Sequence, residues 1–109
     1  MQTILCVSCR GSGSLRDAIG DDTKWLAEYG LVVVEELRKG RSPGWSKLKS
    51  TRPDRDGAVN VRWQQSANLL LCRIVTRGKG DPSLLAGDLT AYLLKRHRRR
   101  IQVITTLVG

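Results

Sequence analysis

Apolar and polar residues alternate through the middle of the chain in a way that predicts a run of β-strands. Consecutive valines after a glycine favour a strand over residues 31–38, because β-branched side chains suit extended backbone. WSKLKS (45–50) and AVNVRW (58–63) alternate strictly, and LLLCRIVTR (69–77) is apolar enough for the middle of a sheet. Turn residues separate these segments at short intervals, so the pattern predicts a strand meander over about residues 31–77.

A helical pattern follows the meander. Asp81 before Pro82 is a helix-start signal, and apolar residues then recur at helical spacing from Leu85 onward. This predicts a helix over about residues 82–99. IQVITTLV then predicts a final strand over about 101–108, and a right-handed crossover would make it parallel to the strand at 69–77.

The first 30 residues predict an acidic N-terminal segment of the same domain. Residues 2–8 suggest a short strand, and weaker signals suggest helix starts at Ser14 and Asp22. A chain of 109 residues is long enough for one modest core. We therefore expect a single α+β domain over residues 1–109, with a mostly antiparallel mixed sheet and helices packed on one face.

Strand alternation divides the side chains between two faces of the expected sheet. The apolar set, which we expect beneath the helix, is Leu48, Val59, Val61, Trp63, Leu70, Cys72 and Ile74. The opposite set combines cations with an aromatic ring: Trp45, Lys47, Lys49, Arg62, Arg73 and Arg77. Cations that follow phosphates around a ring on which a base can stack are typical of surfaces for single-stranded nucleic acid. The same pattern also suits the ordinary solvated side of an antiparallel sheet.

Charge changes the picture, because the formal net charge is +9 and is unevenly distributed. Residues 1–36 carry three cations against six carboxylates, whereas residues 37–109 carry sixteen against four, a net +12. Such a surface favours a polyanionic partner. We therefore expect nucleic-acid binding, with RNA favoured and DNA possible, mainly through the phosphate backbone. The alternative is a protein-interaction module that binds an acidic partner.

KRHRRR, residues 95–100, is a second candidate for phosphate contact. Its cations can neutralise several phosphates and release their counterions. They also suit the C-terminal end of a helix, where the macrodipole favours positive charge. The fixed cations of this cluster are Lys95, Arg96, Arg98, Arg99 and Arg100.

CVSCRGSG, residues 6–13, raises the possibility of a metal or redox site. It resembles one repeat of the zinc element in DnaJ-type chaperones, Cys-x-x-Cys-x-Gly-x-Gly, a family that needs such repeats in pairs. Here a tetrahedral site would have to join Cys6, Cys9, Cys72 and His97. A redox pair would have to lie at the start of a helix. The expectation is that Cys6 is a buried strand residue and that Cys9 begins a loop, with no metal and no cofactor.

The order helix, three strands, helix over residues 22–97 resembles the topology of the double-stranded-RNA-binding domain. The lysine pair that opens that family's second helix has no match in DPSLLAG. The order meander, helix, strand is also similar to the opening of ribonuclease H-like folds, and this resemblance would imply Glu35, Glu36 and Asp88 as candidate metal-binding carboxylates. The lone histidine has no nucleophile that sequence can place beside it, so we expect no enzyme.

The sequence offers no sign of a membrane partner. No stretch approaches the roughly 18 apolar residues of a membrane helix, and the N-terminal segment lacks the pattern of a signal peptide. Three cysteines suit a reducing compartment. The expected location is therefore cytoplasmic.

Overall fold

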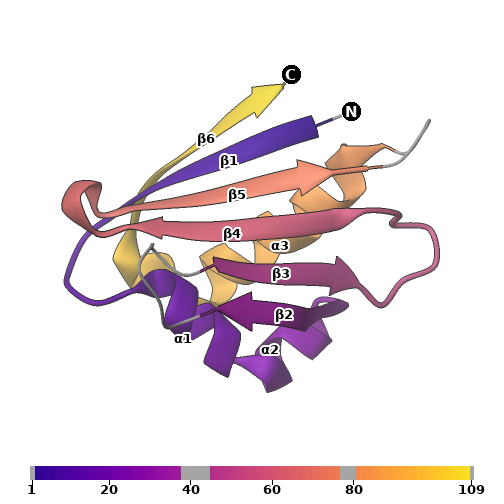
Figure 1. The fold of residues 1–109 in the computed structure, drawn as a ribbon, viewed down its shortest axis with the longest axis horizontal. Coiled ribbons are helices and arrows are strands. Elements are labelled where there is room, and N and C mark those ends of the chain that lie inside the picture. Colours follow the sequence, from indigo (N-terminus) through magenta and orange to yellow (C-terminus); the bar gives the residue numbers. More distant parts are fainter. Residues whose placement is uncertain (1, 38–44, 77–80, 109) are drawn as a thin grey trace.

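The computed structural model of the chain describes residues 2–37, 45–76 and 81–108, which form six strands and three α-helices (Figure 1). The strands are β1 (Gln2–Cys9), β2 (Leu31–Leu37), β3 (Trp45–Ser50), β4 (Ala58–Gln64), β5 (Leu69–Val75) and β6 (Ile101–Val108). The helices are α1 (Leu15–Asp21), α2 (Thr23–Glu28) and α3 (Pro82–Arg96), with short 3-10 turns η1 (Gln65–Ala67) and η2 (Arg98–Arg100). The predicted α+β class, strand meander and final strand are confirmed.

The six strands form one sheet in the order β2-β3-β4-β5-β1-β6, and every neighbouring pair is antiparallel. The expectation of a mixed sheet therefore does not hold for the described strands. Strand β6 does run in the same direction as β5, as the crossover argument required. However, β1 lies between them and pairs with both, so the two parallel strands are not neighbours.

The helices pack on one face of this sheet and leave the other face uncovered (Figure 1). The seven residues predicted to lie beneath the helix are all buried, with none more than 5 % exposed. They pack with Leu85, Leu89 and Tyr92 of α3, which are fully buried. The alternation of strands β3 to β5 and the helical spacing from Leu85 thus identify the core correctly.

The ends of α3 follow from its sequence. The Asp81 side chain accepts a hydrogen bond from the Ser83 N–H at 2.9 Å, and Pro82 occupies the first turn. The helix ends at Arg96, three residues before the predicted end. The chain then tightens into η2, because it must turn to bring the buried Ile101 into β6.

The turn after β3 is anchored to α3 by an ion-pair network. Asp88 of α3 accepts hydrogen bonds from Arg52 at 3.1 Å and from Arg55 at 2.9 Å. Arg55 also binds Asp54, and this hydrogen bond holds the pKa of the Asp54 carboxyl below its usual value. Gly57 closes the turn with φ +119°, and a Cβ there would lie 2.4 Å from the Val75 carbonyl oxygen. The Asp88 carboxylate therefore has a structural role, which is to hold this turn against α3.

Candidate nucleic-acid interface

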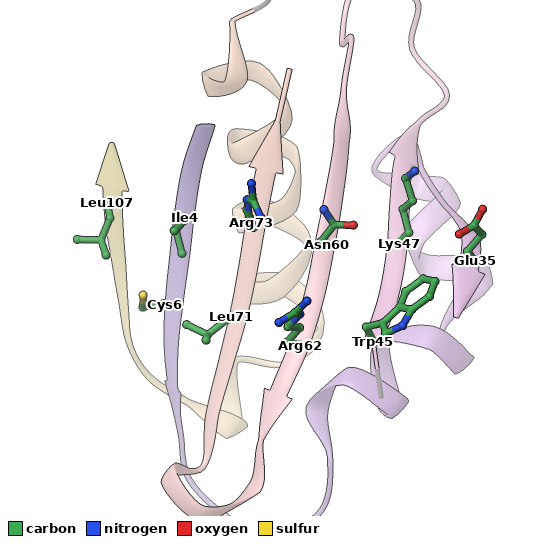
Figure 2. Close-up of a pocket in the computed structure, with 10 residues that line it drawn as sticks. All are labelled: Ile4, Cys6, Glu35, Trp45, Lys47, Asn60, Arg62, Leu71, Arg73 and Leu107. Carbon is green, nitrogen blue, oxygen red and sulfur yellow. The ribbon is translucent and has the colours of Figure 1, made fainter. Parts of the chain in front are cut away.

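The uncovered face of the sheet is hollowed, and Figure 2 shows the side chains around the hollow. The hollow has a volume of about 610 Å³ and draws residues from all six strands. Its lining is Ile4, Cys6, Glu35, Trp45, Lys47, Asn60, Arg62, Leu71, Arg73 and Leu107. Four residues predicted from sequence, Trp45, Lys47, Arg62 and Arg73, are thus brought together at one place.

Strand register explains why these four side chains meet. Trp45 of β3 lies opposite Arg62 of β4, while Lys47 lies opposite Asn60, which in turn lies opposite Arg73 of β5. Directly opposed residues have Cβ atoms about 4.5–5.5 Å apart and point to the same face. Arg62 and Arg73 are exposed, and the Trp45 and Lys47 side chains are half-buried. Cations and an indole ring therefore share an accessible surface.

Two further residues, Lys49 and Arg77, were predicted to lie on this face. Lys49 is exposed and lines an adjacent depression with Lys47, Asn60 and Arg73. Arg77 lies outside the described residues. Arg73 donates from Nε to the Gln2 side-chain oxygen at 2.9 Å, so its guanidinium is partly oriented by β1.

Sequence reasoning missed one side of the hollow. Ile4, Cys6 and Leu107 line it from β1 and β6, and Leu71 lines it from β5. Alternation placed Leu71 on this face, but only the insertion of β1 beside β5 brings the other three next to it. Glu35 of β2 was also missed, and it lies opposite Lys47. The face is consequently basic across β3 to β5 and apolar across β1 and β6.

The predicted cation cluster at residues 95–100 lies on the other side of the molecule, where α3 ends in the helix layer (Figure 1). Its cations also differ from one another in their contacts. Arg96 donates from Nε to both Asp22 carboxylate oxygens, at 3.0 and 3.2 Å, and its guanidinium lies 5.2 Å from the centre of the Trp25 ring. Arg96 therefore ties the end of α3 to the start of α2.

Arg100 has a similar structural role at the start of β6. Its guanidinium donates to the backbone oxygens of Arg10 at 2.6 Å and Gly13 at 2.9 Å, and thereby fixes the loop after β1. Lys95, Arg98 and Arg99, in contrast, are exposed. Three of the five predicted cations thus form an accessible patch, which is separate from the hollow on the open sheet face.

His97 belongs to a half-buried hydrogen-bond network. The Tyr92 hydroxyl lies 2.8 Å from both an Asp22 carboxylate oxygen and His97 Nε2. Since the single hydroxyl proton goes to the ionised carboxylate, the hydroxyl must accept from His97, which places the imidazole proton on Nε2. Burial lowers the pKa of His97 even though Asp22 opposes the shift. His97 is thus a neutral structural partner.

The three cysteines do not converge. Cys6 faces the open side of the sheet and lines the hollow, so it is not buried as expected. Cys9 is the last residue of β1 and does not begin a loop, and both Cys9 and Cys72 are buried in the core on the helix side. Cys6 and Cys9 are three residues apart on one strand, so they point to opposite faces. Burial raises the pKa of the Cys9 thiol and raises that of Cys72 to about 12. The structure therefore does not bring Cys6, Cys9, Cys72 and His97 together.

Across residues 2–37, 45–76 and 81–108 the structure contains no cluster of three or more His, Cys, Asp or Glu placed to hold a metal ion. Within those same ranges no helix combines the length and apolar character needed to cross a bilayer.

Comparison with protein-family models, with curated proteins and with solved structures gave no match to the chain.

Proposed function

We propose that the chain binds single-stranded nucleic acid, RNA in the first place, on the open face of its sheet. The observation that carries this proposal is the hollow in which Trp45, Lys47, Arg62 and Arg73 come together from three adjacent strands. Recognition of single-stranded RNA commonly uses a sheet surface on which bases stack against aromatic rings. The net charge of +9 supports a polyanionic ligand.

The dimensions of the face suit a short segment of single strand. Neighbouring strands lie about 4.8 Å apart, so the cations of β3 to β5 span about 10 Å. RNA-binding sheets that carry several aromatic rings stack two or three bases on them, and the lining of this hollow supplies one ring, that of Trp45. In the proposed complex Trp45 stacks on one base, while Lys47, Arg62 and Arg73 contact phosphates on either side of it. The lysine and arginine contacts supply affinity without regard to sequence.

The apolar side of the hollow supports the same ligand. Leu71 lies opposite Arg62 on one side and Cys6 on the other, and Ile4 lies opposite Arg73. A nucleic-acid strand that extends beyond the cations therefore meets an apolar surface. Bases and ribose carbons can contact such a surface when they are unstacked from one another. Glu35 lies opposite Lys47 and places one carboxylate at the β2 side of the hollow. The ligand therefore extends from Trp45 toward β5 and β1, away from that carboxylate.

The test is a salt series of binding isotherms with short single-stranded RNA, the matching DNA and a duplex. Affinity should fall steeply between about 50 and 200 mM salt. Trp45→Ala should weaken binding by about 1–3 kcal/mol with an unchanged salt slope, because it removes stacking and no charge. Arg62→Gln and Arg73→Gln should each reduce the salt slope by about one.

Matched controls come from the helix side of the molecule. Trp25→Ala removes a half-exposed tryptophan there, and Lys24→Gln removes an exposed cation of α2; neither should alter binding beyond the general effect of net charge. If micromolar protein at low salt binds neither RNA nor DNA, the proposal is wrong. Equal binding of polyglutamate, with no response to Trp45→Ala, would instead indicate an acidic protein partner.

A further inference from the structure

Strand β6 forms one edge of the sheet, and its outer side has no neighbouring strand among the described residues. It is exposed along most of its length, with Val103 55 %, Leu107 51 % and Val108 80 % exposed. Val103 and Leu107 point to the open face, because they pair with Ser8 and Ile4, whereas Val108 points to the helix side. Apolar side chains therefore flank an uncovered row of backbone donors and acceptors on both faces.

This edge lacks the devices that normally prevent strand pairing. Exposed edges are usually protected by charged residues, by proline or by a very short strand. Residues 101–108 contain no charged residue and no proline, and they form a strand of eight residues. The opposite edge, β2, carries exposed Glu35 and Glu36. The two edges of the same sheet thus differ, and β6 is the one free to accept a further strand.

We propose that β6 pairs antiparallel with β6 of a second copy of this chain, to give a dimer with one continuous sheet. The pairing is isologous, since a two-fold axis perpendicular to the sheet brings the same strand from each copy together. The proposal does not depend on nucleic-acid binding.

The side-chain pattern selects one register. Residues opposed across an antiparallel pair must share a face, so only registers that pair odd with odd and even with even positions are compatible with this symmetry. When the two-fold axis passes beside Thr105, Val103 of each copy lies opposite Leu107 of the other. The two Thr105 residues then lie opposite each other. This register pairs residues 102–108 and leaves the cations of η2 outside the paired segment. Centring on Ile104 would oppose Arg100 to the exposed Val108 and would lose both Val103–Leu107 pairs.

Charge explains why the edge is favoured over the face. Stacking two open faces would bury Leu71 and Ile4, but it would also bring Arg62 and Arg73 of each copy against those of the other. Such like-charge contacts are unfavourable. Edge pairing through the uncharged β6 avoids them and keeps both open faces accessible on the same side of the joined sheet.

The experiment is sedimentation analysis across a protein concentration series, without nucleic acid. The parent chain should show a concentration-dependent monomer–dimer equilibrium. Thr105→Lys should raise the dimer dissociation constant by at least about tenfold, because it opposes two cations at the two-fold axis. Val32→Lys is the matched control, since it adds the same charge at the exposed β2 edge and should leave the dissociation constant of the dimer nearly unchanged.

A charge-pair rescue makes the test specific. Thr105→Glu alone should also raise the dimer dissociation constant, while an equal mixture of the Thr105→Lys and Thr105→Glu variants should form a heterodimer. Thermal melting establishes that all variants are folded, as expected for an exposed residue. A parent chain that stays monomeric at every accessible concentration, or a dimer that Thr105→Lys does not weaken, overturns the proposal. Failure of the mixture to associate overturns the Thr105 register.

Discussion

Replacing Tyr92 by phenylalanine should lower the free energy of unfolding by about 2 kcal/mol. The ring lies in the core, but its hydroxyl is the link between Asp22 at the start of α2 and His97 at the end of α3. Burial, together with the hydrogen bond to Asp22, raises the pKa of the Tyr92 hydroxyl, so it is protonated and donates. Phenylalanine keeps the ring and removes both hydrogen bonds.

The size of this loss in free energy depends on Asp22 and His97, the two partners that lose the Tyr92 hydroxyl. A hydrogen bond to a charged group contributes about 1.5–3 kcal/mol. Asp22 keeps its two hydrogen bonds from Arg96, so its carboxylate stays paired and the loss falls short of the upper limit. His97, which is half-buried, loses the acceptor for its Nε2 proton. These two effects together place the change near 2 kcal/mol.

Urea unfolding followed by circular dichroism would measure this change, with Tyr29→Phe as the control. Tyr29 packs edge-to-face on Tyr92 with ring centres 6.1 Å apart, and its hydroxyl is outside the Asp22–His97 network. The control should change stability by less than Tyr92→Phe does. A loss below about 0.5 kcal/mol for Tyr92→Phe would show that the network contributes little to holding α2 against α3.

Three further outcomes are expected. Leu89→Asp should prevent folding, because it buries an unpaired carboxylate, whereas Leu84→Asp on the exposed side of α3 should fold; far-UV circular dichroism distinguishes the two. Burial holds the pKa of His97 below its ordinary value of about 6.5, so the unfolded chain binds a proton before the folded chain does as the pH falls through that value. The free energy of unfolding should therefore decrease in this pH range. In urea titrations at several pH values, His97→Gln should make this decrease smaller. A thiol reagent should modify Cys6 in the native protein and the two buried cysteines only after unfolding, which mass spectrometry would detect; modification of all three at equal rates in native buffer would contradict the assigned faces.

Local patterns in the sequence were sufficient for the faces of β3, β4 and β5. In a strand with strict alternation, a shift of one residue would expose the whole apolar set, so the pattern determines which side is buried. The prediction that Trp45 and Lys47 share a face with Arg62 followed directly from this, and it needed no knowledge of how the strands are ordered.

Contacts between distant parts of the chain could not be predicted in this way. Nothing in QTILCVSC indicates that β1 enters between β5 and β6, and this placement decides the apolar side of the hollow. Likewise, Arg96 appeared equivalent to Arg98 because its partner, Asp22, lies 74 positions away. The cysteine spacing suggested a shared site only until the strand assignment placed Cys6 and Cys9 on opposite faces.

The position of β1 also has a consequence for the order in which the protein folds. Both neighbours of β1 come from later in the chain, and Thr3 pairs with Ile74 on one side and Val108 on the other. Loops that long close slowly, because their ends must find each other before any contact stabilises them. During synthesis, β2, β3 and β4 can pair with one another before β1 has any partner, because both of its neighbours, β5 and β6, follow them in the chain. Strand β1 should therefore be among the last of the six strands to acquire its native structure.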